Sequence, residues 1–362
     1  MSETITVTGL GKPYDVVVQA GLLAEVGECV RQVAPAKQAV VVTNDVVWPL
    51  FEQVVTASLE AADFSVVPTV VKDGERYKTV DTLAEVYEAV LPKQIDRRTP
   101  VIGLGGGVAT DLAGFAAATL LRGLPYVAVP TSLLAIVDAS VGGKTGVNHA
   151  VGKNLVGAFY PASLVLIDPA TLATLPEREL RGGLAECVKH DVIGDAEHLA
   201  TMEQQAEAYL SRDAEALAEL VSHNVRVKAS VVAEDPYEQG VRAHLNLGHT
   251  FGHAFEKVSD YAMSHGEAVA AGTVVACRLS ADLGMMSAEE AKRVESLIQS
   301  LGLPTKIDPA LDVDAILSAM QSDKKVRDGK IRLVLPTRLG AATVRDDVDD
   351  DLIRRVVTAA SA

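Results

Sequence analysis

Residues 101–111 read VIGLGGGVATD. An apolar run precedes three consecutive glycines, and a helix-forming segment follows them, which predicts a strand, a tight turn and a helix. Glycines let the backbone approach a ligand closely, and N–H groups at a helix start favour a diphosphate. The pattern differs from the Rossmann fingerprint, because Val108 stands at the third glycine position. A dinucleotide-binding turn and a tight connection without a ligand therefore both remain open. Asp111 is expected in the first helical turn, where a carboxylate interacts favourably with the helix dipole.

The segments around this turn alternate between apolar runs and amphipathic stretches. Continuous apolar strands separated by helices predict a parallel α/β sheet that is covered on both faces. The expected strands lie near 16–18, 38–43, 65–71, 125–130 and 163–167, and the expected helices over 22–34, 48–61 and 80–91.

From Pro176 onward the chain is rich in Ala, Glu and Leu with a 3.6-residue period. The expected helices cover 177–192, 195–209, 213–233, 248–259, 266–283, 288–301, 312–321 and 349–360, with one strand over 331–335. The sequence thus predicts a Rossmann-like parallel α/β domain (1–175) and a mainly α-helical domain (176–362). The active site is expected in the cleft between these domains.

The composition excludes several classes of function. The 362 residues carry 33 basic and 48 acidic side chains, a net charge of −15, so the overall field disfavours nucleic acid and anionic membranes. An anionic substrate can still bind where cationic residues gather. Cys29, Cys187 and Cys277 are odd in number and widely spaced, which favours a reducing compartment, the cytoplasm. We expect neither a signal peptide nor a membrane span.

Candidate metal ligands occur in three segments. In GGLAECVKHD (182–191), Glu186, Lys189 and His190 share one helical face. NLGHTFGHAFE (246–256) places His249 and His253 one turn apart, and AMSHGEAV (262–269) carries His265 just before a helix. One carboxylate with two or three imidazoles suits zinc with an open coordination position. The alternative is that a histidine is only a hydrogen-bonded structural or surface residue. We prefer this interpretation for His198, His223 and His244. Cys187 is interpreted as a small buried apolar residue.

A second group of candidates is cationic. Lys144 and Lys153 lie among glycines and apolar residues, not on a charged helix face. Any one of these cations can be a solvated surface charge, but several in one cleft would bind phosphate and carboxylate groups. The further members are Arg122, Lys228, Arg242, Lys324 and Lys325.

As a set, these motifs resemble the 3-dehydroquinate synthase family of sugar-phosphate cyclases, which is related to the glycerol dehydrogenases. The matching stretches are DGERYK (73–78), GLGGGVATDLAGFAAATLLRG (103–123), VPTSLLAIVDASVGGKTGVN (129–148), VGKNLVGAFYP (151–161), GGLAECVKH (182–190), LNLGHTFGHAFE (245–256) and SHGEAVAAG (264–272).

The resemblance implies residue roles. The ligands of zinc, with Co²⁺ as an alternative ion, fall on Glu186, His249 and His265. Contacts to NAD fall on Asp73, Gly74, Glu75, Arg76, Tyr77, Lys78, Gly105, Gly106, Gly107, Val108, Ala109, Thr110, Asp111, Thr131, Ser132, Lys144, Lys153, Thr171, Leu172, Ala173 and Thr174. The catalytic and substrate-binding residues fall on Arg122, Asp138, Lys144, Lys153, Asn154, Lys189, Lys228, Arg242, Asn246, His253 and Lys324 or Lys325. An acid near the adenosine ribose would align with Asn44 or Asp45.

The implied activity is that of a phosphorus–oxygen lyase in aromatic amino-acid biosynthesis by the shikimate pathway. The substrate is a small anionic sugar-acid phosphate, 3-deoxy-D-arabino-heptulosonate 7-phosphate, and the enzyme is a homodimer. Transient oxidation by NAD, phosphate elimination, reduction and an intramolecular aldol step give 3-dehydroquinate. The alternatives are another cyclase of the 2-deoxy-scyllo-inosose or valiolone synthase type, a polyol dehydrogenase, or an inactive NAD-binding scaffold. Arg242 with Asn246 favours a carboxylate substrate.

Overall fold

The computed structural model describes residues 2–321 and 331–361, which form two compact units. Unit 1 comprises Met1–Leu175 and Leu217–Tyr237, and unit 2 comprises Pro176–Ala216 and Glu238–Ala362. The break after Leu175 lies where the sequence changes character. Most of α7 (Ala214–Glu234) nevertheless belongs to unit 1, which the periodicity of the sequence did not reveal.

Unit 1 is built on a seven-stranded sheet with the order β1-β2-β9-β6-β5-β3-β4. The strands from β2 to β4 in this order run parallel, and β1 is antiparallel to β2. The strands are β1 (Ser2–Val7), β2 (Tyr14–Gln19), β3 (Gln38–Asn44), β4 (Ser65–Val71), β5 (Val101–Gly105), β6 (Tyr126–Pro130) and β9 (Leu164–Ile167). The central strands β5, β6 and β9 are buried throughout, as the continuous apolar runs predict.

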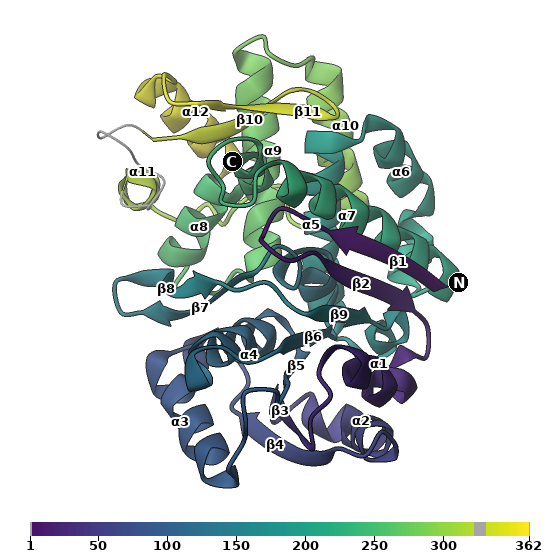
Figure 1. The fold of residues 1–362 in the computed structure, drawn as a ribbon. Helices are drawn as coiled ribbons and strands as arrows, with labels where there is room; N and C mark the ends of the chain where they lie inside the picture. Colours follow the sequence, from purple (N-terminus) through teal and green to yellow (C-terminus); the bar gives the residue numbers. More distant parts are fainter. Residues whose placement is uncertain (1, 322–330, 362) are drawn as a thin grey trace. The chain divides into compact units, whose positions relative to one another are not determined.

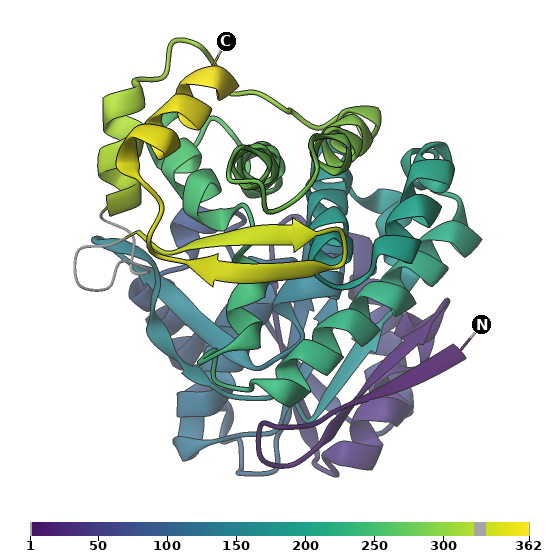
Figure 2. The same ribbon diagram turned by 90° about the horizontal axis from the view of Figure 1, so that it is seen from above.

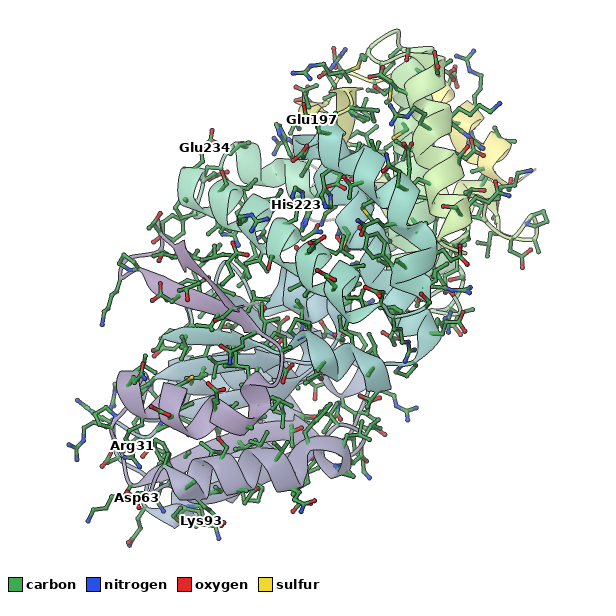
Figure 3. The ribbon with its side chains drawn as sticks, turned by 90° about the vertical axis from the view of Figure 1, so that its right-hand side faces the viewer. Arg31, Asp63, Lys93, Glu197, His223 and Glu234 are labelled. Atoms are coloured by element: carbon green, nitrogen blue, oxygen red, sulfur yellow. The ribbon has the colours of Figure 1, made fainter. Side chains whose placement is uncertain are left out.

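Helices cover both faces of this sheet, with α1 and α2 on one side and α3 and α4 on the other (Figure 1). They are α1 (Val26–Val33), α2 (Trp48–Ala61), α3 (Val80–Val90) and α4 (Gly107–Thr119). Arg31, labelled in Figure 3, connects the end of α1 with the segment after α2. Its guanidinium lies 3.8 Å from the ring centroid of Phe64, and its Nε donates to the Ala62 carbonyl at 2.9 Å.

An antiparallel hairpin of β7 (Lys144–His149) and β8 (Gly152–Phe159) completes unit 1. This segment is rich in glycine, and its sequence pattern did not predict strands. Its glycines explain the close pairing, because a Cβ on Gly157 would lie 2.1 Å from the Thr145 carbonyl oxygen. Lys144 pairs with Phe159 at one end of the ladder, whereas Gly152, next to Lys153, pairs with His149 at the other.

Unit 2 is mainly helical, as predicted. Its helices are α5 (Glu177–Gly194), α6 (Ala196–Leu210), α8 (His249–Val258), α9 (His265–Asp282), α10 (Ala288–Ser300), α11 (Val313–Gln321) and α12 (Asp350–Ala360). A hairpin of β10 (Leu333–Arg338) and β11 (Ala341–Arg345) packs against α9 and α5, and Figure 2 shows it as two yellow arrows. The sequence predicted a strand near β10 but not β11. Among the described residues, every helix is too short or too polar to cross a bilayer.

Candidate functional site

Most of the residues that the resemblance assigns to NAD lie at the carboxyl-terminal edge of the unit 1 sheet, whereas Lys144 and Lys153 lie on the β7–β8 hairpin. The residues at this edge follow the carboxyl ends of parallel strands: residues 73–78 come after β4, Gly105 ends β5 and is followed by Gly106 and Gly107, and Thr131 and Ser132 come after β6. The strand order reverses between β3 and β5, since β4 lies on the far side of β3. Open α/β sheets bind ligands outside the carboxyl ends of strands at such a switch point. The topology therefore supports a cofactor at this edge.

The glycine-rich turn leads directly into α4 without a side-chain cap at Gly106. Gly105 has φ 146°, and a Cβ there would lie 2.9 Å from the Cβ of Ala109, so this position requires glycine. The prediction for Asp111 was wrong in one respect. Because α4 begins at Gly107, Asp111 lies beyond the first turn and has no helix-dipole role there.

Asp111 instead forms a buried ion pair with Lys78. The Lys78 ammonium also donates to Asn154 Oδ1 at 2.7 Å. Burial lowers the pKa of Lys78, but attraction to Asp111 and Glu75 outweighs it and the pKa is raised. Lys78 is therefore charged, and it connects the turn after β4, helix α4 and strand β8.

Asn148, which no sequence motif assigned to the site, belongs to the same network. Its side-chain amide donates to Glu75 Oε1 at 2.7 Å, and its Oδ1 accepts from the Asn154 backbone N–H at 2.8 Å. Asn154 has φ 55°, a left-handed conformation that asparagine tolerates better than most residues. The predicted cofactor residue Glu75 and the predicted substrate residue Asn154 are thus held by one side chain. The position of Asn148 between two charged motifs was a weak signal for this role.

Other predicted residues of unit 1 lie around this edge with mixed exposure. Asn44 ends β3 and contacts Asp73, with 2.7 Å between Nδ2 and Oδ1. In the 3-10 helix η6 (Pro169–Thr174), Thr171 and Leu172 are buried, whereas Ala173 and Thr174 are exposed. Asp168 caps this helix by accepting from the Ala170 N–H at 3.0 Å.

Two cations of unit 1 have contrasting surroundings. Lys228 on α7 is buried and contacts Asp138, with 2.6 Å between Nζ and Oδ1. The pairing of these two predicted substrate residues orients the ammonium. Arg122 is exposed with φ 66°, directly after Leu121 with φ 50°. Two successive non-glycine residues in the left-handed region are each costly, by roughly 1–2 kcal/mol. Lys324 and Lys325 lie outside the described residues.

In unit 2 the predicted metal ligands converge. Glu186 comes from the middle of α5, and His249 and His265 are the first residues of α8 and α9. His249 Nε2 lies 3.7 Å from Glu186 Oε1, and His265 Nε2 lies 3.4 Å from the same oxygen. One ligand atom from each of these residues lies within 4.8 Å of the others. A carboxylate and two imidazoles at this spacing form a three-ligand set that fits zinc with a coordination position for water or substrate.

Close helix packing brings these ligands together. A Cβ on Gly266 would lie 2.2 Å from the Cα of Gly182, so α5 and α9 meet backbone to backbone. Gly248, directly before His249, has φ 76°, and a Cβ there would lie 2.4 Å from Thr273 Oγ1. A capping box between Ser264 and Glu267 begins α9 at His265. The glycines and the cap therefore determine where the imidazoles lie.

The surroundings of the ligands are highly charged for a protein interior. Glu186 is fully buried and forms an ion pair with Lys189, which is 1% exposed. Burial lowers the pKa of His265, but hydrogen bonds to Glu186 and Glu256 outweigh it and raise the pKa to about 9. Buried charges in such a cluster are costly, and they are characteristic of functional sites.

His253 lies beside the ligand set. Its ring centroid is 5.5 Å from that of His249 and 6.0 Å from that of His265. His190, which shares a face of α5 with Glu186, is fully buried and outside the convergent ligand atoms. Cys187 is buried, as predicted, and its thiol pKa is raised well above its usual value by burial.

Arg242 and Asn246 lie in the 3-10 helix η7 (Val241–Asn246), which packs against α5. Arg242 is 2% exposed. The Asn246 amide donates to Glu238 Oε1 at 2.5 Å. A buried guanidinium is rare without a specific role, because its desolvation is costly.

Sequence comparison identifies the family. Residues 68–182 match the model described as 3-dehydroquinate synthase N-terminal, and residues 183–326 match the model described as 3-dehydroquinate synthase C-terminal. The chain belongs to the 3-dehydroquinate synthase family. It is 43% identical to a 3-dehydroquinate synthase of Microcystis aeruginosa over 99% of this chain and 98% of the relative. A 3-dehydroquinate synthase of Nitrosomonas europaea is 44% identical over 97% of this chain and 95% of that protein.

Solved structures of the wider cyclase group have the same fold. The 2-epi-5-epi-valiolone synthase of Streptomyces hygroscopicus, solved with NAD⁺ and Zn²⁺, is 32% identical with a TM-score of 0.89, over 98% of this chain and 99% of that one. A 2-deoxy-scyllo-inosose synthase, solved with carbaglucose-6-phosphate, NAD⁺ and Co²⁺, is 24% identical with a TM-score of 0.90, over 99% and 100%. The fold class predicted from the sequence is confirmed.

Proposed function

We propose that this enzyme is a phosphorus–oxygen lyase that converts 3-deoxy-D-arabino-heptulosonate 7-phosphate to 3-dehydroquinate and phosphate. The observation that carries the proposal is the full-length identity of 42–44% with proteins named 3-dehydroquinate synthase. The similarity to valiolone synthase is lower, at 32%. The convergence of Glu186, His249 and His265 adds the metal chemistry that this reaction requires.

We assign the cofactors to the two sets of residues described above. When bound, NAD⁺ would act as a reversible hydride acceptor. The carboxyl-terminal edge of the unit 1 sheet and the uncapped start of α4 would hold its diphosphate. Zn²⁺, or Co²⁺ in its place, polarises a substrate oxygen, and Glu186, His249 and His265 would hold it. The zinc assignment agrees with the donor set, since both histidines direct Nε2 toward the oxygen of one carboxylate.

The functional division of the chain follows from these assignments. We propose that residues 1–175 serve mainly as the NAD-binding part, and that residues 176–362 serve as the metal- and substrate-binding part. The segment Leu217–Tyr237, which packs within unit 1, adds the substrate residue Lys228 to the first part.

The substrate's two anionic ends need different partners. Arg242 offers a planar guanidinium that matches the C1 carboxylate, whereas Lys144, Lys153 and Asn154 offer point donors for phosphate. Holding the phosphate near C6–H lets the leaving group itself accept that proton. Lys189 and Lys228 are each held by a carboxylate, which orients their ammonium groups.

His253 is the candidate for proton transfer at the substrate hydroxyls. Its ring lies next to both ligand histidines, and an imidazole can both accept and donate a proton. Asn246 and Asp138 complete the substrate contacts in this proposal.

The proposal also includes a cytoplasmic homodimer. Cys29, Cys187 and Cys277 carry unpaired thiols, which agrees with a reducing compartment. The exposed guanidinium of Arg122, on a turn of costly backbone conformation, suits a contact with substrate phosphate in a partner subunit. A small anionic substrate is the expected partner, with neither nucleic acid nor membrane.

The decisive experiment measures phosphate release from the heptulosonate phosphate with and without NAD⁺ and EDTA. We expect release that depends on NAD⁺, is abolished by EDTA, and leaves no net NADH. Turnover of a sugar phosphate without a carboxylate would favour a valiolone or inosose synthase. Steady NADH accumulation with glycerol would favour a polyol dehydrogenase.

A further inference from the structure

Glu256 lies beside the proposed metal ligands, although neither the motifs nor the proposed mechanism gives it a role. It is on α8 and is 3% exposed. Its Oε2 lies 3.2 Å from Nδ1 of His265, while Nε2 of the same ring lies 3.4 Å from Glu186 Oε1. The two nitrogens of His265 therefore face two different carboxylates.

His249 has the corresponding arrangement with a backbone acceptor. Its Nδ1 lies 3.0 Å from the Leu247 carbonyl oxygen, and its Nε2 faces Glu186 Oε1. A carbonyl oxygen only accepts, so Nδ1 carries the proton and Nε2 presents its lone pair. Metal-ligating histidines typically donate their second N–H to a carboxylate or a carbonyl in this way.

A second grouping must be weighed, because ligand atoms of His253, Glu256 and His265 also lie within 4.8 Å of one another. In that grouping Glu256 itself would be a ligand. The orientation of His249 argues against it, since the Nε2 atoms of both His249 and His265 converge on a single oxygen of Glu186. Glu256 lies on the opposite side of the His265 ring from that oxygen.

We propose that Glu256 is a positioning residue for the metal centre. Its carboxylate holds the proton on Nδ1 of His265, so that Nε2 is the nitrogen that ligates the ion. The inference rests on the proposed function, because it presumes a metal bound by Glu186, His249 and His265.

The fold separates this role from a structural one. The backbone at His265 is fixed by the capping box of Ser264 and Glu267, and Arg178 Nε donates to Glu267 Oε1 at 2.9 Å. These contacts do not involve the Glu256 carboxylate. Its removal should therefore leave the start of α9 in place while the His265 ring loses its orientation.

The test compares metal-free wild type with Glu256→Ala, Glu256→Gln and a control, Glu295→Gln. The control removes the same charge from a 2.6 Å pair with Arg278 elsewhere in unit 2. Zinc affinity is measured by competition with a chromophoric chelator. We expect Glu256→Ala to bind zinc about 10–100-fold more weakly, which is typical for loss of such a partner. Glu256→Gln should lie between Ala and wild type because its amide oxygen accepts from Nδ1, and the control should match wild type.

Co²⁺ absorption spectra separate positioning from ligation. A positioning role predicts that the Gln variant keeps the wild-type coordination number with shifted bands, whereas loss of one ligand from the spectrum would overturn the inference. Wild-type zinc affinity in the Ala variant would also overturn it, while phosphate release by wild type would leave the proposed function intact. Failure of wild type to bind zinc would overturn both. If the Ala variant does not fold, as judged by circular dichroism, the Gln variant decides.

Discussion

The site carboxylates have different partners in the two units: lysine ammonium groups in unit 1, and mainly histidine imidazoles around Glu186 in unit 2. In unit 1 two lysine ammonium groups each pair with one carboxylate, Lys78 with Asp111 and Lys228 with Asp138. In unit 2 two imidazole nitrogens approach Glu186, which also contacts Lys189. An ammonium only donates, whereas a neutral imidazole offers a lone pair. We infer from the proposed function that the pairs of unit 1 orient cations for an anionic ligand, and that the cluster of unit 2 can receive a cation once His265 has lost its proton.

The largest expected effect comes from removing the acid at the centre of the unit 2 cluster. Glu186→Ala should abolish metal binding and lower phosphate release by about 1000-fold, since a metal supplies several kcal/mol to the transition state. Metal content and phosphate release check this on the purified variant. Glu203→Gln, which breaks an exposed pair with Arg293, serves as the control. Full phosphate release by Glu186→Ala without bound metal would show that the unit 2 cluster is not a catalytic metal site.

The second effect tests whether the ion pairs of unit 1 orient cations for the substrate. Lys228→Met should lower kcat/KM by about 10–100-fold, in line with about 1.5–3 kcal/mol for a charged hydrogen bond. Steady-state phosphate release measures it, and zinc affinity should be unchanged. If zinc affinity fell and kcat/KM did not, the assignment of Lys228 to the substrate would be wrong.

The third effect concerns Arg242, a buried guanidinium of unit 2. Arg242→Ala should raise KM about tenfold or more, because the C1 carboxylate of the substrate loses a charged hydrogen bond of about 1.5–3 kcal/mol. Arg242→Lys should recover only part of the loss, since an ammonium lacks the planar fork. Arg226→Ala, an exposed arginine paired with Glu3, provides the comparison. A KM equal to that of wild type in Arg242→Ala would refute the role.

The smallest effect is a proton count. The His265 pKa of about 9 in the metal-free protein means that this imidazole is charged at pH 7.5 and must lose a proton to ligate. Zinc binding should therefore release about one proton from His265, and apparent affinity should rise with pH until pH 9. Calorimetry in two buffers of different ionisation enthalpy measures the release. Binding without proton release would show that His265 is already neutral.

The sequence predicted the elements whose burial follows a simple period. Helix α2 and strand β4 were predicted at their observed bounds, 48–61 and 65–71, because an amphipathic run and a short run rich in valine give clear signals. The β7–β8 hairpin was missed, since its glycines and lysines lack the alternation of a half-buried strand. Strand β11 is partly exposed along its whole length and gave no pattern.

The convergence of the three proposed metal ligands could be predicted because they lie in short motifs that the family resemblance covers. Their partners could not, because those contacts depend on tertiary packing. Glu256 is seven residues after His249, two turns along the same helical stripe, which is a signal only once His265 is known to lie beside it. The pairing of Lys78 with Asp111 likewise joins a loop to a helix 33 residues away.

The contact between Gly182 and Gly266 has a consequence for changing the metal. Where two main chains touch, no side chain is available to trim or enlarge, and the distance between Glu186 and His265 cannot be adjusted by local substitution. An ion of different radius would require one whole helix to slide along another. Altering ion preference in this scaffold should therefore begin with the chemical identity of the three donors, and the helix spacing should be left untouched.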